Sequence, residues 1–206
     1  METLLNTFVV LFIVIDPVGL APMFLALSPG ASRADQRKMA RNGTLLASGM
    51  LLVFFFIGDR LLAALGIGIP AFRIAGGVLL FLLAIDMVFA RQSGLRSTTI
   101  REQREAEIRQ DISVFPLAFP LIAGPGALTT VLLMSSSAQG VFAFVGTLAV
   151  LMTVLGLTLV SLLYAARILQ FLGETGTNVI SRLFGLVLAA LAVQFILDGV
   201  HASFHG

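Results

Sequence analysis

The most restrictive feature of this sequence is a series of six long, predominantly apolar stretches. Each has about 20 residues or more, the length that an α-helix needs to cross the hydrocarbon core of a bilayer. The stretches do not alternate between polar and apolar residues, which favours helices over the strands of a barrel. The sequence therefore predicts an all-α membrane protein with six transmembrane helices, at residues 4–27, 39–62, 69–89, 114–134, 141–166 and 179–200.

The composition supports lipid as the solvent of this chain. Hydrophobic residues make up 58% of the 206 residues and charged residues 12%, against about 25% charged residues in soluble domains. Too few polar residues are present to coat a soluble core, so the lipid bilayer is the expected partner of the outer surface. The net charge of +2 does not indicate nucleic-acid binding, because basic residues of membrane proteins gather in cytoplasmic loops.

Basic residues are distributed unevenly between the two sides of the predicted membrane domain. With six spans, the loops after the first, third and fifth spans share one side. Of the 13 basic residues, only Arg60 and Arg73 fall on the other side. Because basic residues accumulate in cytoplasmic loops, both termini are expected to face away from the cytoplasm.

Two landmarks recur at nearly the same interval, which indicates an internal repeat. Residues 15–19 (IDPVG) correspond to residues 123–127 (AGPGA), 108 positions later, and Arg73 corresponds to Arg182, 109 positions later. Each half has three spans, an odd number, so the second half is predicted to enter the membrane in the inverted orientation. Inverted repeats are common in secondary transporters, with the substrate site near the midplane. A duplication retained only for packing is the alternative.

The predicted organisation is one membrane domain in three parts. Residues 1–90 form the first three-helix repeat, and residues 113–206 form the second. Residues 91–112 form a charged cytoplasmic loop between them, in which the run R-E-Q-R-E has the charge pattern of a solvated helix.

Proline and glycine interrupt two of the predicted spans near the middle of the membrane. Asp16-Pro17 lies within the first span, and Gly124-Pro125-Gly126 lies within the fourth. Proline lacks a backbone donor and clashes with the preceding turn, and glycine allows non-helical angles, so helices 1 and 4 are expected to be broken there. Freed backbone groups at this depth are tolerated where protein or a water-lined cavity satisfies them. Matched breaks therefore indicate a binding site, and kinks that serve packing alone are the alternative.

The chemistry of the two breaks suggests what the site binds. Asp16 followed by Pro17 is a signal for a helix start, and Gly124-Pro125 is the same signal without a side-chain cap. The free N–H groups and the positive dipole end at Gly126 suit a carboxylate. Asp16 suits an ammonium group or a coupling cation, unless it only caps its own helix. A small zwitterionic substrate would satisfy both breaks.

The rest of the sequence adds one weaker site residue and argues against catalysis. Thr129 lies about one turn beyond Gly126, although threonine in membrane helices commonly bonds to its own backbone. There is no H-E-x-x-H motif, no phosphate-binding glycine loop and no nucleophile elbow in the sequence. We therefore expect no enzymatic activity, no metal site, and no cofactor beyond a coupling proton or sodium ion.

Three segments closely resemble the MarC family of bacterial and archaeal inner-membrane proteins. They are residues 15–24 (IDPVGLAPMF), 73–77 (RIAGG) and 119–126 (FPLIAGPG). The resemblance covers essentially the whole chain and implies six spans in the inner membrane, with both termini periplasmic under the charge distribution above. For some relatives it implies transport of small neutral amino acids. The discontinuous-helix positions of the family correspond here to Asp16, Pro17, Gly19, Gly124, Pro125 and Gly126.

The main functional hypothesis is a secondary transporter of small neutral amino acids, driven by a proton or sodium gradient. The resemblance, together with the zwitterion inferred from the breaks, suggests glycine, alanine or serine as the substrate. Direct coupling to ATP is not expected, because the chain contains no nucleotide-binding motif. A non-transporting membrane scaffold, whose broken helices are packing features, is one alternative, and an uncharacterised pore is another.

Overall fold

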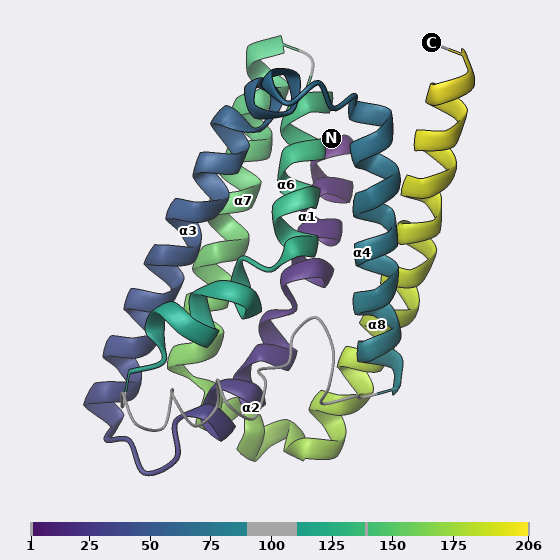
Figure 1. The fold of residues 1–206 in the computed structure, drawn as a ribbon. Coiled ribbons are helices and arrows are strands. Elements are labelled where there is room, and N and C mark those ends of the chain that lie inside the picture. The colour runs from purple at the N-terminus through teal and green to yellow at the C-terminus, as the bar shows by residue number, and fades with distance from the viewer. Residues whose placement is uncertain (1, 90–110, 139, 206) are drawn as a thin grey trace.

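The computed structural model describes residues 2–89, 111–138 and 140–205, and the regular structure in these segments is helical (Figure 1). Most of the predicted charged loop at residues 91–112 lies outside the described residues. The all-α fold is confirmed for the described part of the chain. Its helices are α1 (Glu2–Ile15), α2 (Pro17–Leu27), α3 (Arg33–Ala64), α4 (Ile69–Phe89), η1 (Ser113–Ile122), α6 (Pro125–Ser137), α7 (Gly140–Leu163) and α8 (Ala165–His205).

The helices are long and apolar enough for a membrane protein. Among the described residues, five segments meet the length and hydropathy of a membrane span, and the first of them combines α1 with α2. The pair η1 and α6 meets the same criteria only when the two helices are taken together as one span bent by 57°. The fold is therefore that of an integral membrane protein with five or six spans, in the regions that the hydropathy predicted.

α3 begins earlier than its apolar stretch, which starts at residue 39. The Ser32 hydroxyl oxygen accepts the Asp35 N–H at 3.1 Å, and the hydroxyl donates to the Asp35 carboxylate at 2.6 Å. This reciprocal cap satisfies the first turn of the helix, so the polar residues that follow Ser32 are also helical. The prediction began too late because hydropathy marks only the part of a helix that lies in lipid.

α8 is also longer than the predicted span at residues 179–200, and it bends at Gly173. The backbone of Gly173 has φ 68° and ψ 171°, and this positive φ is readily adopted only by glycine. The residues before the bend form a short helical piece at the same end of the molecule as α2, and the residues after it run back to the opposite end (Figure 1). Both termini lie at that opposite end (Figure 1).

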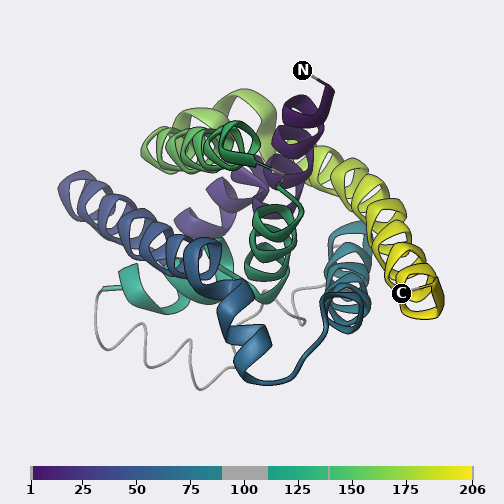
Figure 2. The same ribbon diagram turned by 90° about the horizontal axis from the view of Figure 1, so that it is seen from above.

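α1, α2 and α6 occupy the interior of the helical bundle. α3 and α7 cover one side of them, and α4 and α8 pack together on the other side (Figures 1 and 2). In the most apolar part of Leu4–Leu27, 61% of the residues are buried within the protein, against 22–33% in the other four spans. The first span is therefore largely enclosed by other helices, whereas most residues in the apolar parts of the other four spans are at least partly exposed on the outside of the bundle.

α4 and α8 run antiparallel in close contact. A Cβ added to Gly77 would lie 2.8 Å from the carbonyl oxygen of Ala192, and one added to Gly199 would lie 2.9 Å from that of Pro70. Small residues at such contacts let helix backbones approach each other, and the resulting van der Waals packing is a main source of helix association in lipid. The contact fixes the position of α4 beside the interior helices.

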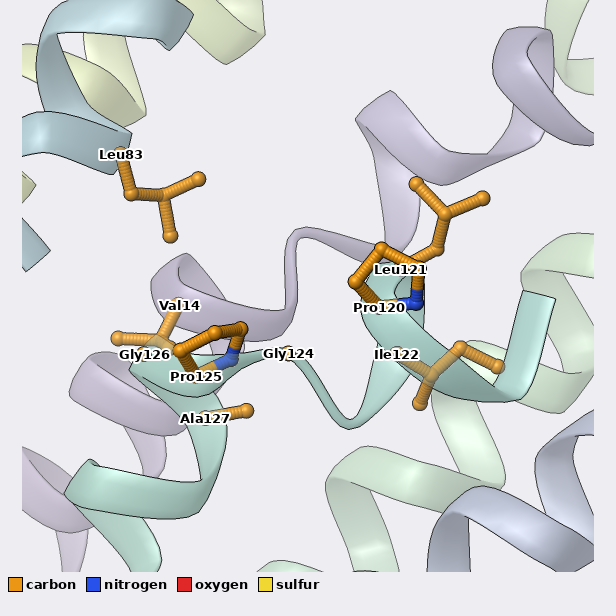
Figure 3. A pocket seen from close by; sticks show the side chains of 9 residues that line it. All are labelled: Val14, Leu83, Pro120, Leu121, Ile122, Gly124, Pro125, Gly126 and Ala127. Atoms are coloured by element: carbon orange, nitrogen blue, oxygen red, sulfur yellow. The ribbon is translucent and has the colours of Figure 1, made fainter. Parts of the chain in front are cut away.

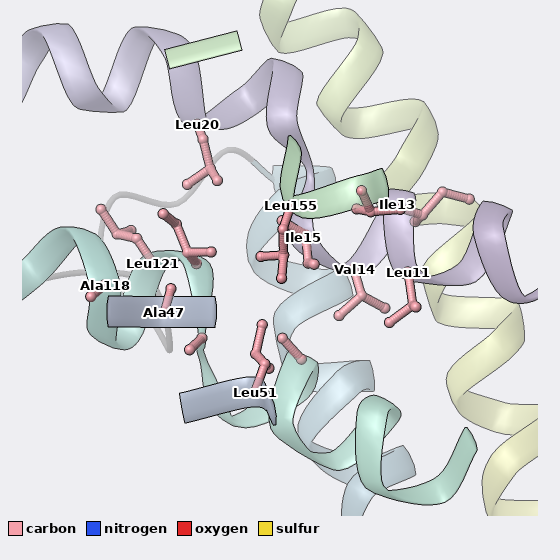
Figure 4. Close-up of a cluster of buried hydrophobic side chains, with 14 of the residues drawn as sticks. Leu11, Ile13, Val14, Ile15, Leu20, Ala47, Leu51, Ala118, Leu121 and Leu155 are labelled. Carbon is pink, nitrogen blue, oxygen red and sulfur yellow. The ribbon is translucent and has the colours of Figure 1, made fainter. Parts of the chain in front are cut away.

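The largest buried side chains gather in the middle of the bundle (Figure 4). Ile15 and Leu20, on either side of the start of α2, are fully buried, and so are Leu51 of α3 and Ile122 at the end of η1. This core surrounds the two places where one interior helix gives way to the next. Asp16 is buried within this core, whereas Gly124 and Pro125 are partly exposed.

Candidate functional site

The first junction, which is Asp16 between α1 and α2, is closed by its own side chain. Asp16 has φ 53° and ψ 65°, in the left-handed region that aspartate tolerates better than most residues. Its Oδ1 accepts the Gly19 N–H at 3.0 Å, and its carbonyl oxygen accepts the Leu20 N–H at 3.0 Å. Pro17, the first residue of α2, has no N–H to satisfy. The start of α2 is therefore a capped helix N-terminus.

Two serines from distant helices are hydrogen-bonded to the first junction. Ser181 of α8 donates to Asp16 Oδ2 at 3.2 Å, and Ser161 of α7 donates to the carbonyl oxygen of Pro17. Asp16 is only 1% exposed, so the junction is joined to two neighbouring helices within the protein interior. Sequence reasoning missed both serines, because serine in a membrane helix commonly bonds to its own backbone and no local pattern relates these positions to Asp16.

Gly19 provides the space that this arrangement needs. A Cβ at Gly19 would lie 2.2 Å from Asp16 Oδ2 and 2.5 Å from Ser181 Oγ. A side chain at this position would therefore displace the carboxylate from the cap or from the serine. The absence of a side chain at Gly19 preserves the geometry of the cap.

η1 leads into the second junction, which consists of residues 123 and 124, with an irregular backbone. Phe115 (φ −134°, ψ 129°) and Phe119 (φ −131°, ψ 130°) are extended, since each precedes a proline and a following proline disfavours the helical region. The Ala123 N–H donates to the Ala118 carbonyl at 2.9 Å, a five-residue interval typical of a π-helix. η1 ends there, so the carbonyl groups of its last turn have no partners in a continuing helix.

The second junction differs from the first in that no side chain caps the helix that follows. Gly124 is extended (φ −69°, ψ 169°), and Pro125 begins α6. The first hydrogen bond of α6 runs from the Leu128 N–H to the Gly124 carbonyl at 3.0 Å. The N–H groups of Gly126 and Ala127 precede it, so they have no acceptor within α6, and among the described residues no side-chain cap is found at this helix start. This helix start carries a partial positive charge that suits an anion.

Steric contact keeps the second junction uncapped. The φ of −69° at Gly124 does not require glycine, but a Cβ there would lie 2.4 Å from the carbonyl oxygen of Pro120. Residues that commonly cap helices, such as serine, threonine and aspartate, all carry a Cβ. The backbone of η1 therefore excludes a cap at position 124.

A small cavity lies at the second junction (Figure 3). The space open to the centre of a water-sized sphere is about 10 Å³, which is room for about one water molecule. Its wall combines the backbone and apolar side chains of residues 120–127 with apolar side chains from α1 and α4. The lining residues are Val14, Leu83, Pro120, Leu121, Ile122, Gly124, Pro125, Gly126 and Ala127.

The structure brings together only part of the predicted site. Three of the predicted residues line the cavity: Gly124, Pro125 and Gly126. Four others do not, namely Asp16, Pro17 and Gly19 at the first junction and Thr129 on α6. Val14, two residues before Asp16, connects the cavity with the helix that leads into the first junction.

Both threonines near the start of α6 make contacts within the helix packing. Thr130 Oγ1 donates to the Gly126 carbonyl at 2.8 Å. The methyl group of Thr129 packs against Gly76 of α4, where an added Cβ would lie 1.9 Å from Thr129 Cγ2. Thr129 therefore contributes to the contact between α4 and α6.

Val14 and Leu83 are cavity residues that sequence reasoning missed. Both are aliphatic residues within apolar spans, and the side chains are 1% and 5% exposed. In a membrane helix both the lipid-facing and the protein-facing sides are apolar, so hydropathy cannot distinguish the side chains that line a cavity. Only the rotation of α1 and α4 within the bundle identifies these two.

The far end of α6 is hydrogen-bonded to its neighbours. Ser136 donates to the Asp59 carboxylate of α3, and the Arg73 guanidinium of α4 donates to Ser137 at 3.4 Å. The end of α6 is thus held by side chains of two helices, while its start borders the cavity.

A further polar contact lies outside the membrane-spanning segments, just before η1. Asp111 Oδ1 accepts hydrogen bonds from the Ser113 hydroxyl and from the Ser113 N–H, the latter at 2.9 Å. These hydrogen bonds, the hydroxyl first, hold the pKa of Asp111 below its ordinary value against a smaller opposing effect of burial, and Lys38 adds a minor electrostatic contribution. The charged form of Asp111 therefore anchors the start of η1.

Sequence comparisons relate the chain to known membrane proteins. A family model described as MarC family integral membrane protein matches residues 1–204. UPF0056 membrane protein YvbG of Bacillus subtilis is 35% identical over 201 residues, covering 98% of this chain and 95% of that protein. UPF0056 membrane protein MJ1677 of Methanocaldococcus jannaschii is 34% identical, covering 94% and 93%. UPF0056 inner membrane protein YhgN of Escherichia coli is 32% identical over the whole of both chains. No solved structure matches.

Proposed function

The chain belongs to the MarC family of integral membrane proteins, and we propose that it is a secondary transporter of small neutral amino acids such as glycine, alanine or serine. The observation that carries the proposal is the uncapped start of α6, where the Gly126 and Ala127 N–H groups border a cavity inside a membrane protein. The name of its relative YhgN, an inner membrane protein, supports the inner membrane as the location. The proposed orientation has both termini in the periplasm.

In this proposal the substrate carboxylate binds at the start of α6. The N–H groups of Gly126 and Ala127 are the donors, and the positive end of the α6 dipole adds a favourable field. Hydrogen bonds from N–H groups to an ionised acceptor are roughly twice as strong as those between neutral groups. A carboxylate leaving water for the protein interior needs such compensation.

The ammonium group of the substrate has acceptors at the same junction. Pro120, Leu121 and Ile122 line the cavity, and they belong to the last turn of η1, whose carbonyl groups lack partners in a continuing helix. The end of one helix and the start of the next would thus bind the two charges of a zwitterion once the cavity, which in this structure has room for about one water molecule, has widened to admit it. This is the arrangement that broken helices provide in secondary transporters.

Asp16 was expected to bind an ammonium group or a coupling cation. Its oxygens accept hydrogen bonds from Gly19 and Ser181, and it does not line the cavity. We therefore propose that Asp16 binds the coupling cation, a proton or sodium ion, rather than the substrate. Protonation or cation binding at a capping carboxylate would weaken its hydrogen bonds and so alter how α2 is held.

Correspondences between the two halves support an inverted repeat with helices 1 and 4 broken at mid-membrane depth. α3 packs against η1 and α6 as α7 packs against α1 and α2, and α4 contacts α6 as α8 contacts α2. Ser28 and Ser136, 108 positions apart, each donate to the carbonyl four residues earlier, at Phe24 and Leu132 respectively. Two halves of this kind allow a central site to open alternately to either side.

Uptake into vesicles tests the proposal. Purified protein in proteoliposomes is expected to accumulate radiolabelled glycine or alanine with saturation kinetics when a proton or sodium gradient is imposed. Absence of uptake for every small neutral amino acid would contradict the transporter and favour a membrane scaffold. Flux that does not saturate and needs no gradient would indicate a pore.

A matched pair of glycine substitutions tests the site. Gly126→Leu places a large side chain where an added Cβ already lies 2.9 Å from Leu80 Cδ2 and 3.3 Å from Leu83 Cδ2, and it should abolish uptake. Gly156→Leu on α7 is the control, because no atom lies within 4 Å of a Cβ there. If both variants lose uptake equally, or if both retain it, the start of α6 is not part of the substrate site.

A further inference from the structure

A row of exposed side chains on α3 changes from basic to apolar along its length. Residues four apart on a helix are neighbours and form a continuous ridge on its surface. The α3 ridge is such a row, with three arginines followed by three apolar residues, all of them exposed. Its members are Arg33, Arg37, Arg41, Leu45, Gly49 and Val53. Because α3 lies at the edge of the bundle (Figures 1 and 2), the ridge faces the surroundings of the protein rather than another helix.

The apolar part of the α3 ridge borders a groove of about 420 Å³ on the outer surface. Ligand-binding clefts in proteins have volumes of roughly 300–1,000 Å³. Gly49 opens the groove, because it places no side chain between Leu45 and Val53, and no atom lies within 4 Å of a Cβ added to it. The residues that line the groove are all apolar: Leu45, Leu46, Gly49, Met50, Val53 and Phe54.

The arginines of the α3 ridge keep their positive charge available for an external ligand. Asp35 is the only acidic residue within 33–41, and it is hydrogen-bonded to Ser32 in the cap of α3. Lys38, on the neighbouring row of the helix, acts on the carboxylate of Asp111. None of the three arginines forms an ion pair with another residue that the structure describes.

We infer that the α3 ridge binds an anionic phospholipid, with the phosphate at Arg37 and Arg41 and one acyl chain in the groove. Guanidinium groups bind phosphate oxygens through paired hydrogen bonds, and two arginines four residues apart lie side by side on a helix. Leu45 follows Arg41 by one turn, so the ridge presents charge and then apolar surface in the order of a lipid headgroup and its chain. This inference does not depend on whether the protein transports amino acids.

The length of the groove and its position support a lipid of one leaflet as the occupant. From Leu45 to Phe54 the helix rises about 14 Å, at 1.5 Å per residue, and one leaflet contributes about half of the roughly 30 Å hydrocarbon core. In the proposed orientation the basic end of α3 faces the cytoplasm, where basic residues next to a span are attracted to anionic lipids. The groove therefore matches the depth that an acyl chain occupies below its headgroup.

The charge of the α3 ridge argues against a second copy of the chain as the occupant. Two copies in one membrane share the same orientation, and a two-fold interface places the same surface of each copy against the other. Such a contact through the groove would bring the arginines of both ridges together without an intervening anion. A phosphate between Arg37 and Arg41 removes this repulsion, whereas a second copy adds to it.

Native mass spectrometry of the purified protein in a neutral detergent tests the charged part of the site. Dioleoyl phosphatidylglycerol is expected to bind as one molecule in preference to dioleoyl phosphatidylcholine. The double variant Arg37→Gln/Arg41→Gln should bind phosphatidylglycerol about thirtyfold more weakly, since each basic residue near an anionic lipid contributes about fivefold. Arg60→Gln is the control, because Arg60 is exposed near the other end of α3, and it should bind like wild type.

A pair of glycine substitutions tests the apolar part. Gly49→Leu fills the groove without a clash, because no atom lies within 4 Å of a Cβ there. It should weaken phosphatidylglycerol binding about tenfold, the equivalent of about two methylene groups that lose their contact. Gly156→Leu on α7 is the matched control with equally open surroundings, and its binding should be that of wild type.

Four results would overturn the inference. The first is equal binding of the two phospholipids, and the second is an equal effect of Arg60→Gln and of the arginine double variant. The third is binding of glycerol 3-phosphate as tight as that of phosphatidylglycerol, which would show a site for a free anion. The fourth is wild-type binding by Gly49→Leu. A dimer without bound phosphatidylglycerol that Gly49→Leu dissociates would also overturn it, by assigning the groove to a second copy.

Discussion

The two junctions of the interior helices begin their second helix with the same residue type, proline, and yet end in opposite states. At the first, Asp16 caps α2 and is itself hydrogen-bonded to Ser181 of α8. At the second, Gly124 offers no cap, and the start of α6 borders a cavity. A helix start in lipid must be satisfied by something. Where the protein supplies the partner, the junction is a fixed structural element; under the proposed function, the substrate supplies the partner at the other junction.

The comparison assigns different roles to the two junctions. The first junction is joined by side chains to α7 and α8, whereas the second is bordered by aliphatic side chains and backbone. We therefore expect substitutions at the second junction to affect substrate binding and those at the first to affect coupling and stability. The following predictions test this division, starting from the largest expected effect.

Gly124→Ala should disrupt the second junction most strongly. Its methyl group would lie 2.4 Å from the Pro120 carbonyl oxygen, which is backbone and cannot rotate away. Overpacking of this kind costs roughly 1–3 kcal/mol, and displacement of the α6 start should abolish uptake. Thermal unfolding in detergent and uptake in vesicles are the measurements. Gly156→Ala is the control because its surroundings are open, and wild-type behaviour of Gly124→Ala would show that this junction adapts.

Replacements of Asp16 distinguish a cap from a coupling site. Asn can still accept the Gly19 N–H, so Asp16→Asn should retain most of the stability, whereas Asp16→Ala should lose about 1 kcal/mol or more with the cap. If the charge couples transport, Asp16→Asn loses gradient-driven accumulation but keeps exchange of labelled for unlabelled substrate. Accumulation by Asp16→Asn at the wild-type level would leave Asp16 as a cap alone.

Ser181→Ala should weaken the first junction without altering substrate affinity. It removes one hydrogen bond to the buried carboxylate, and hydrogen bonds to charged groups contribute about 1.5–3 kcal/mol. The expected result is a lower thermal stability with a KM for glycine within about threefold of wild type, since a threefold change corresponds to less than about 1 kcal/mol. Thr153→Ala is the matched control, since that exposed hydroxyl donates only to its own helix at Ala149. An increase in the KM for glycine of more than about threefold, with thermal stability unchanged, would place Ser181 at the substrate site.

The smallest effect is expected at Asp111, near the start of η1. Its pKa is lowered by the hydrogen bonds from Ser113, so the charged form contributes stability that is fully present above the unfolded pKa of about 4 and is lost as the pH falls through the lower folded value. Asp111→Asn should flatten this part of the pH dependence. Thermal unfolding measured between pH 7 and pH 3 checks this prediction. If thermal stability depends on pH equally in wild type and Asp111→Asn, the contact does not stabilise η1.

Much of the architecture could be predicted from the sequence. The spans follow from hydropathy, and the starts of α2 and α6 fall at Pro17 and Pro125, as the local chemistry of proline indicates. The presence of a cap at Asp16 and its absence at Gly124 are also local, since a helix start is capped by the residue directly before it. The extension of α3 to Arg33 was missed because a cap rather than hydropathy decides it.

The sequence by itself determined that the chain lies in a membrane, that it is helical and where the interior helices begin, because in lipid each backbone group must be satisfied within a few residues. Only the tertiary structure decided which side chains meet at those places. Ser181 reaches Asp16 across 165 positions, Leu83 borders the cavity, and Thr129 turns toward Gly76 instead. These contacts depend on how each helix is rotated in the bundle. Rotation leaves no trace in the sequence when both the lipid-facing and the protein-facing sides of a helix are apolar.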